Sequence, residues 1–134
     1  MEFEHILVQR SGDFATVTMN RPQRRNALSL EHMRELISAF RVLGDSDALG
    51  IVLAGNGPVF SAGHDFAAVA GADLSSVRSL LVTCTELMTL MQQVPQPVVA
   101  RVHGLATAAA PAPWGQGPGA GPGGRAPQGR DRPR

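Results

Sequence analysis

The sequence contains no lysine and no tyrosine, and it has one cysteine and one tryptophan. All twelve basic side chains are therefore arginines, and they face eleven acidic ones, so the formal net charge is +1 at pH 7. A chain this close to neutral has no bulk field that attracts nucleic acid or an acidic membrane surface. Lysine and tyrosine codons are rich in A and T, whereas arginine, glycine, alanine and proline codons can be nearly pure G and C. The composition therefore indicates a GC-rich gene.

The single cysteine, Cys84, excludes an intramolecular disulfide and favours a reducing compartment. We expect it to pack as a small apolar side chain rather than to act as a nucleophile. No apolar run approaches the roughly 20 residues that span a bilayer. The first residues, MEFEHILVQRSGDF, resemble neither a secretory signal nor a transit peptide. These features favour a soluble protein of the cytoplasm, with the mitochondrion as the alternative in a eukaryote, and predict no membrane and no nucleic-acid partner.

Short β-like runs and amphipathic helical patterns are what the sequence does contain. Residues 5–9 and 14–19 are rich in β-formers and are separated by Ser-Gly-Asp, which predicts a β-hairpin. Ser29 is a predicted helix N-cap and Gly44 the predicted stop. Between them, apolar residues recur with helical spacing at Met33, Leu36, Ile37 and Phe40.

The second half of this pattern predicts a strand at residues 50–54, a helix at 75–93 and a strand at 98–102. The first of these strands is continuously apolar, which is typical of a parallel sheet. One side of the helix is expected to be core, through Val77, Leu80, Leu81, Cys84, Leu87, Met88 and Met91. The order of hairpin, helix, strand, helix and strand predicts an α/β fold, and 134 residues allow one domain at most.

Residues 110–134 differ in kind from the rest of the chain. They comprise seven Gly, six Pro, four Ala, four Arg and four others, and Trp114 is their only large apolar side chain. Such a segment cannot bury enough apolar surface to offset its ordering entropy, so we expect a disordered tail. We expect Trp114 to be solvated; loose nucleic-acid contact by the four arginines is the disfavoured alternative. The predicted organisation is therefore a domain at 1–109 and a tail at 110–134.

Two loops rich in small residues each follow a predicted strand. They are FSAGHDF at residues 60–66 and HGLATAA at residues 103–109. Small residues let a ligand approach the backbone, and two N–H groups that converge on one carbonyl oxygen form an oxyanion hole. From spacing alone, simple turns are the more frequent explanation of such loops.

Four blocks of sequence in a defined order carry a family resemblance. Asn20-Arg21-Pro22, Asn26-Ala27-Leu28, FSAGHDF and QPVVARVHGLATAA together resemble the enoyl-CoA hydratase/isomerase (crotonase) superfamily. The SAGHDF block is most similar to the group of enoyl-CoA hydratase domain-containing protein 3 and its bacterial relatives. The resemblance covers residues 1–109, whereas full-length members of the family are considerably longer.

The resemblance implies the N-terminal part of a spiral of ββα turns, in a family that forms trimers and dimers of trimers. It implies acyl-CoA thioester substrates of fatty acid metabolism, no metal, and no cofactor besides the coenzyme A of the substrate. The thioester carbonyl would be held by the backbone N–H groups of His64 and Ala109. The adenine and pantetheine side of the cleft would be bordered by Arg24, Ala27, Ser61, Ala62, Gly63, Asp65 and Phe66.

Three of these residues have alternative interpretations. The imidazole of His64 could act as a general base, but the family role of this position is through its backbone. Asp65 could act as an acid, although capping of the helix after the loop is the favoured interpretation. Arg24 could simply be solvated.

The chain departs from the family after Ala109. In hydratases a catalytic glutamate follows the second N–H donor at the position of Ala112, and a second one follows where this chain has its Gly/Pro-rich tail. We therefore expect no catalytic activity, and we interpret residues 110–134 as the product of a frameshift or an alternative exon. The alternative function is a non-catalytic fragment that binds CoA or docks on intact family members. Exposed apolar strands at 51–54 and 98–102 predict self-association or aggregation.

Overall fold

The computed structural model describes residues 2–65, 71 and 73–106. Four strands form the main sheet in the order β1-β2-β3-β5, with β1 at Ile6–Ser11, β2 at Phe14–Met19, β3 at Gly50–Gly55 and β5 at Val98–Arg101. β1 and β2 pair antiparallel as the predicted hairpin, whereas β2, β3 and β5 run parallel. The predicted tail, its boundary after residue 109 and Trp114 lie outside the described residues.

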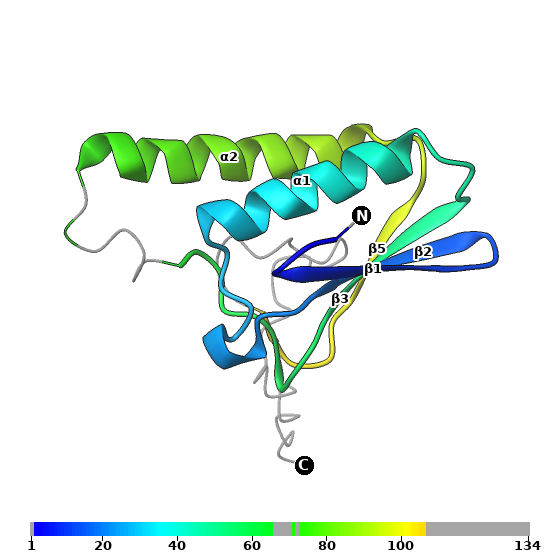
Figure 1. Ribbon diagram of the computed structural model, residues 1–134, viewed down its shortest axis with the longest axis horizontal. Coiled ribbons are helices and arrows are strands. Elements are labelled where there is room, and N and C mark those ends of the chain that lie inside the picture. The colour runs from blue at the N-terminus through cyan, green and yellow to red at the C-terminus, as the bar shows by residue number, and fades with distance from the viewer. Residues whose placement is uncertain (1, 66–70, 72, 107–134) are drawn as a thin grey trace, which may run out of the picture.

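Two helices connect the parallel strands. α1 (Leu30–Gly44) lies between β2 and β3 in the chain, and α2 (Leu74–Gln93) precedes β5. Figure 1 shows both helices on the same face of the main sheet, and α1 packs against α2 as well as against β1 and β2. Successive parallel strands joined through helices on one face produce a repeating β–α turn. The predicted α/β class is therefore confirmed.

The core lies between the helices and the sheet. Alternate residues of β2 point towards the helices, so Ala15, Val17 and Met19 are fully buried. The predicted stripe of α1 is confirmed, because all four of its apolar residues are buried. In α2 the buried residues are Leu80, Cys84, Leu87 and Met91. The prediction that Leu81 is core was wrong: its side chain is 49% exposed, because the buried stripe of α2 is narrower than its apolar pattern.

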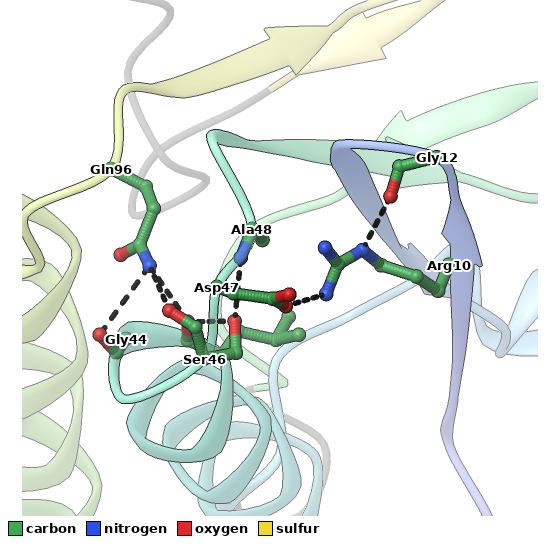
Figure 2. Close-up of polar contacts among 8 residues, drawn as sticks. Arg10, Gly12, Gly44, Ser46, Asp47, Ala48 and Gln96 are labelled. Carbon is green, nitrogen blue, oxygen red and sulfur yellow. Dashed lines mark hydrogen bonds and ion pairs between the residues drawn. The ribbon is translucent and has the colours of Figure 1, made fainter.

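The ends of α1 are fixed by side chains. At the N-terminus the Ser29 hydroxyl accepts a bond from the backbone N–H of His32 at 3.2 Å, as the sequence predicts for an N-cap. At the C-terminus the Gln96 amide donates to the carbonyl of Leu43 at 2.9 Å and also approaches those of Gly44 and Ser46 (Figure 2). The Leu43 carbonyl also accepts the backbone N–H and the hydroxyl of Ser46, so Gln96 adds a third donor at a helix end whose carbonyls have no partner within the helix.

A small second sheet was not predicted. β4 (Val59–Ser61) pairs parallel with β6 (Leu105–Ala106), with Ser61 opposite Ala106. The close approach requires a glycine before β6, because a Cβ on Gly104 would lie 2.4 Å from the carbonyl oxygen of Pro58. Since these two strands are parallel, their carboxyl ends lie at the same end of the small sheet.

Candidate functional site

The first feature of the site is a set of backbone hydrogen bonds between residues 25–28 and 62–65, which we call the seam. Leu28 and His64 form a parallel bridge, in which the N–H of Leu28 donates to Gly63 at 2.7 Å and the N–H of Asp65 donates to Leu28 at 3.1 Å. The N–H of Ala62 donates to the carbonyl of Arg25 at 2.9 Å. The blocks that contain Asn26-Ala27-Leu28 and FSAGHDF, far apart in the sequence, therefore lie directly beside each other.

Hydrogen bonds of the buried Asn26 side chain stabilise this seam. Its side chain is fully buried, and its amide nitrogen faces the carbonyl oxygens of Asn56, Val59 and Phe60 at 2.8, 3.0 and 3.1 Å. Its amide oxygen accepts the N–H of Arg21 at 2.8 Å. The backbone of Asn26 has φ +52°, a conformation that asparagine tolerates better than most residues. Sequence reasoning quoted Asn26 only as part of a block and missed this role.

Ser61 and Gly63 complete the inner side of the seam. The Ser61 hydroxyl is buried, donates to the carbonyl of Asn26 at 2.9 Å and accepts the N–H of Gly63 at 3.2 Å. Gly63 has φ +83°, which strains residues that carry a Cβ. The side chain of Ser61 thus orders the loop, and its predicted contribution to a ligand cleft stays a prediction.

A buried ion pair lies at one end of the seam. The guanidinium of Arg21 is 3.7 Å from the carboxylate of Asp65, and their side chains are only 12% and 8% exposed. The same guanidinium donates to the carbonyl of Ala27 and to the hydroxyl of Ser29, each at 3.0 Å. Arg21 was quoted from the sequence only as part of a block, and its ion pair was not predicted. The helix that Asp65 is predicted to cap falls in residues 66–70, outside the described residues.

The other predicted border residues occupy different surroundings. Arg24 lies in a short 3-10 helix, η1 (Pro22–Arg24), and is exposed. Ala27 is half-buried and lies in the seam directly after Asn26. Phe66 and Ala109 lie outside the described residues.

His64 lines a pocket against α2. The pocket has a volume of about 350 Å³ and is lined, besides His64, by Leu81, Cys84, Thr85, Met88, Thr89 and Gln92. Burial lowers the pKa of the His64 imidazole, which favours its neutral form. Burial also raises the pKa of the Cys84 thiol, so the thiolate is disfavoured. The chemistry of Cys84 fits its predicted role as a buried apolar side chain.

The bridge fixes the direction in which the backbone N–H of His64 points. In a parallel bridge the neighbours of the central residue supply the bonds, so the N–H and C=O of that residue point to the opposite side. Gly63 and Asp65 make the bonds to Leu28. The N–H of His64 therefore points away from Leu28.

Within residues 2–65, 71 and 73–106, no group of three or more His, Cys, Asp or Glu side chains is placed to hold a metal ion. In that same part of the chain no helix is long and apolar enough to cross a membrane.

Solved structures of similar fold define the class of protein. The enoyl-CoA hydratase of Mycobacterium smegmatis matches with a TM-score of 0.76 and 39% identity, over 80% of this chain and 43% of that chain. Human enoyl-CoA hydratase domain-containing protein 3 matches with a TM-score of 0.76 and 31% identity, over 79% of this chain and 43% of that chain. The described residues therefore have the fold of the N-terminal part of a crotonase-type protein, as the resemblance implied.

Sequence comparison then identifies the family. The enoyl-CoA hydratase/isomerase family model matches residues 9–110. Mitochondrial enoyl-CoA hydratase domain-containing protein 3 of Danio rerio is 39% identical over 77% of this chain, which is 36% of that protein. Mitochondrial Δ3,5-Δ2,4-dienoyl-CoA isomerase of Rattus norvegicus is 32% identical over 66% of this chain, which is 31% of that protein. The chain belongs to the enoyl-CoA hydratase/isomerase family, and it spans about a third of the length of these relatives.

Proposed function

We propose that residues 1–109 form the N-terminal part of an acyl-CoA site, in which backbone N–H groups of His64 and Ala109 receive the thioester carbonyl. The observation that carries this proposal is the parallel bridge between Leu28 and His64. It holds the loop through Gly63 and Asp65 in one register and turns the N–H of His64 away from Leu28. A preoriented donor of this kind stabilises negative charge on an oxygen without reorganisation.

The small sheet supports the second donor. Ser61 pairs with Ala106, and His64 and Ala109 each follow their paired residue by three positions in the sequence. The residues that follow two parallel strands begin at the same end of the sheet. The proposal therefore places the two N–H donors on neighbouring loops, at the end of the sheet where both loops begin.

The seam supplies the proposed path of coenzyme A. In this proposal Arg24 and Ala27 would border one side of the path, and the other side would be bordered by Ser61, Ala62, Gly63, Asp65 and Phe66. Exposed Arg24 is suited to a phosphate of the coenzyme, because a guanidinium donates to phosphate oxygens in a fixed planar geometry. The pocket between His64 and α2, with Leu81 and Met88 in its wall, would take the acyl portion.

The proposed site would receive a carbonyl, but the sequence has no carboxylate at the position of the family's catalytic glutamate. Family hydratases have a catalytic glutamate at the position of Ala112, whose methyl group moves no proton. General acid–base assistance contributes about 10²–10⁴-fold per group. We therefore expect the chain to bind acyl-CoA without hydrating it.

The test combines turnover with binding. The purified chain is expected to consume crotonyl-CoA at the rate of buffer alone, and to bind CoA in calorimetry. Arg24→Ala should weaken binding, whereas Arg78→Ala, which removes an exposed arginine of α2, should not. Hydration well above the buffer rate contradicts the predicted inactivity, and absence of CoA binding contradicts the proposed site.

A second candidate function is a non-catalytic fragment that docks on intact crotonase-family proteins. It is favoured by apolar side chains on the sheet that remain exposed, among them Leu7, Phe14 and Val99 at 45%, 57% and 59%. Co-purification with an intact paralogue tests it, and a chain that elutes alone contradicts it. A related expectation is that copies of this chain associate with one another.

The origin of residues 110–134 and the compartment stay predictions. Translation of the encoding DNA beyond Ala109 in the other two frames tests the frameshift: a Gly-Cys-(Glu or Gln)-Leu continuation supports it. Relatives from Danio rerio and Rattus norvegicus are named as mitochondrial. Imaging of the tagged chain distinguishes that compartment from the cytoplasm.

A further inference from the structure

A histidine in the first turn of α1 is completely buried beside the seam. The Nδ1 of His32 lies 3.0 Å from the carbonyl oxygen of Ala27. A carbonyl only accepts hydrogen bonds, so Nδ1 carries the proton of this ring. The pKa of His32 is lowered to about 4, mainly by burial, which keeps the imidazole neutral near pH 7. The ring is therefore a neutral donor that points back from the helix to the loop before it.

The bond to Ala27 reaches the candidate site within one residue. The same carbonyl accepts a second bond from the guanidinium of Arg21 at 3.0 Å. The next residue, Leu28, makes both backbone bonds of the bridge to the His64 loop. A donor that fixes the carbonyl of Ala27 thus also fixes the peptide plane between Ala27 and Leu28, which contains the N–H that bonds to Gly63.

The other nitrogen of the ring shows that packing alone does not explain this histidine. Nε2 of His32 is buried and has no hydrogen-bond partner among the described residues. A buried polar atom without a partner costs free energy that an aliphatic side chain of similar size avoids. The hydrogen bond to Ala27 is therefore the interaction that an aliphatic side chain at this position would lose.

We propose that His32 is a positioning residue, which fixes the carbonyl of Ala27 and so holds Leu28 in register with His64. The expected effect of His32 on ligand binding rests on the proposed acyl-CoA site. Its expected effect on the seam does not depend on that site. His32 itself touches no reacting atom.

Two substitutions separate the hydrogen bond from the packing. In His32→Asn the side-chain amide nitrogen occupies about the place of Nδ1, so the donor is kept and the orphaned Nε2 is removed. In His32→Leu the donor is lost, but an apolar side chain fills much of the space. The full chain carries each variant, and the amides of Leu28 and Asp65 report on the seam because both belong to the bridge.

The first measurement is amide hydrogen exchange by NMR. In His32→Leu the amides of Leu28 and Asp65 are expected to exchange about tenfold faster than in the wild type, as for the loss of one hydrogen bond. Amides in the middle of α1 should keep their rates, and His32→Asn should restore the seam. Unchanged rates at Leu28 and Asp65, or rates that change equally along α1, overturn the inference.

The second measurement is the affinity for CoA by calorimetry. His32→Leu should weaken binding about tenfold while His32→Asn binds like the wild type. Wild-type binding with no change in His32→Leu overturns the positioning role. A wild type that does not bind CoA defeats the proposed function instead, and the exchange rates then decide the role of His32 on their own.

Discussion

At the scale of single residues, Asn26 is expected to contribute most to the seam. Asn26→Gly keeps access to a positive φ but removes the amide group whose two N–H donors are shared among three backbone carbonyls. Leaving buried carbonyls without partners should lower the free energy of unfolding by about 3 kcal/mol, and Asn26→Ala should cost about 1 kcal/mol more through backbone strain. Urea denaturation measures both.

A matched control for Asn26 lies nearby on the surface. Asn20 bonds through its side chain to the amide of Asn56 at 2.8 Å, but this contact is exposed. Asn20→Ala should therefore change the free energy of unfolding by no more than about 0.5 kcal/mol. If Asn26→Gly were as mild as Asn20→Ala, the central role of Asn26 in the seam would be wrong.

His32 gives the stability of the protein a defined pH dependence. Its pKa is about 4 in the folded protein, against 6.5 for an unperturbed histidine. Burial lowers it most, the bond to Ala27 and the charge of Glu35 act in the opposite direction, and Arg21 and His5 lower it further. Between these two values the unfolded state binds more protons, so stability falls as the pH is lowered through this window. The expected loss is about 3 kcal/mol.

The difference between the wild type and His32→Asn isolates this effect, because the carboxylates titrate in both proteins. Urea unfolding at a series of pH values from neutral to mildly acidic should show a steeper loss of stability in the wild type. Parallel pH profiles for the two proteins would mean that His32 does not titrate with a lowered pKa in the folded state.

At the scale of secondary structure, long periodic elements were predictable and short ones were not. Ser29 and the helical spacing from Met33 to Phe40 predicted α1 correctly, because caps and periodicity act locally. β4 and β6 contain three and two residues, too few to establish any period. Leu81 was placed in the core wrongly, because the sequence of α2 does not show which half of a wide apolar face meets α1.

The seam itself could be predicted only in outline. The family resemblance singled out both of its segments, but not that they pair with each other. The contact from Asn26 to Phe60 joins residues separated by 34 positions, and the pairing of Arg21 with Asp65 is equally non-local. No local propensity encodes such contacts. The one local signal is an asparagine directly after a turn, where a positive φ is common.

The end of α1 offers a test at the same scale. Gln96→Leu removes the amide that donates to the carbonyl of Leu43 and should lower the free energy of unfolding by about 1 kcal/mol, because Ser46 still donates to that carbonyl. Gln96→Glu should cost more, because a carboxylate would be buried beside carbonyl oxygens. Thermal unfolding checks both, and a Gln96→Glu variant as stable as Gln96→Leu contradicts this account.

At the scale of the whole molecule, the two faces of the main sheet differ. The helices cover one face (Figure 1), while Leu7 of β1 and Val99 of β5 point away from them and are 45% and 59% exposed. Their neighbours Ile6 and Val98 pack on the core side. The family members that this chain resembles are longer, since it matches about a third of their length. The exposed face is therefore the part of the fold with most to gain from a further covering layer.

We expect this face to drive self-association of the purified chain. Leu7→Thr with Val99→Thr keeps two good β-formers while it removes apolar surface, so the fold should persist and the association should weaken by about 2 kcal/mol, or about thirtyfold. Val82→Thr provides the control, because Val82 is 60% exposed on α2 and away from the sheet. Sedimentation velocity over a range of concentrations measures the effect. A wild type that stays monomeric throughout contradicts self-association, whereas an equal effect of Val82→Thr shifts the contact from the sheet to the helix.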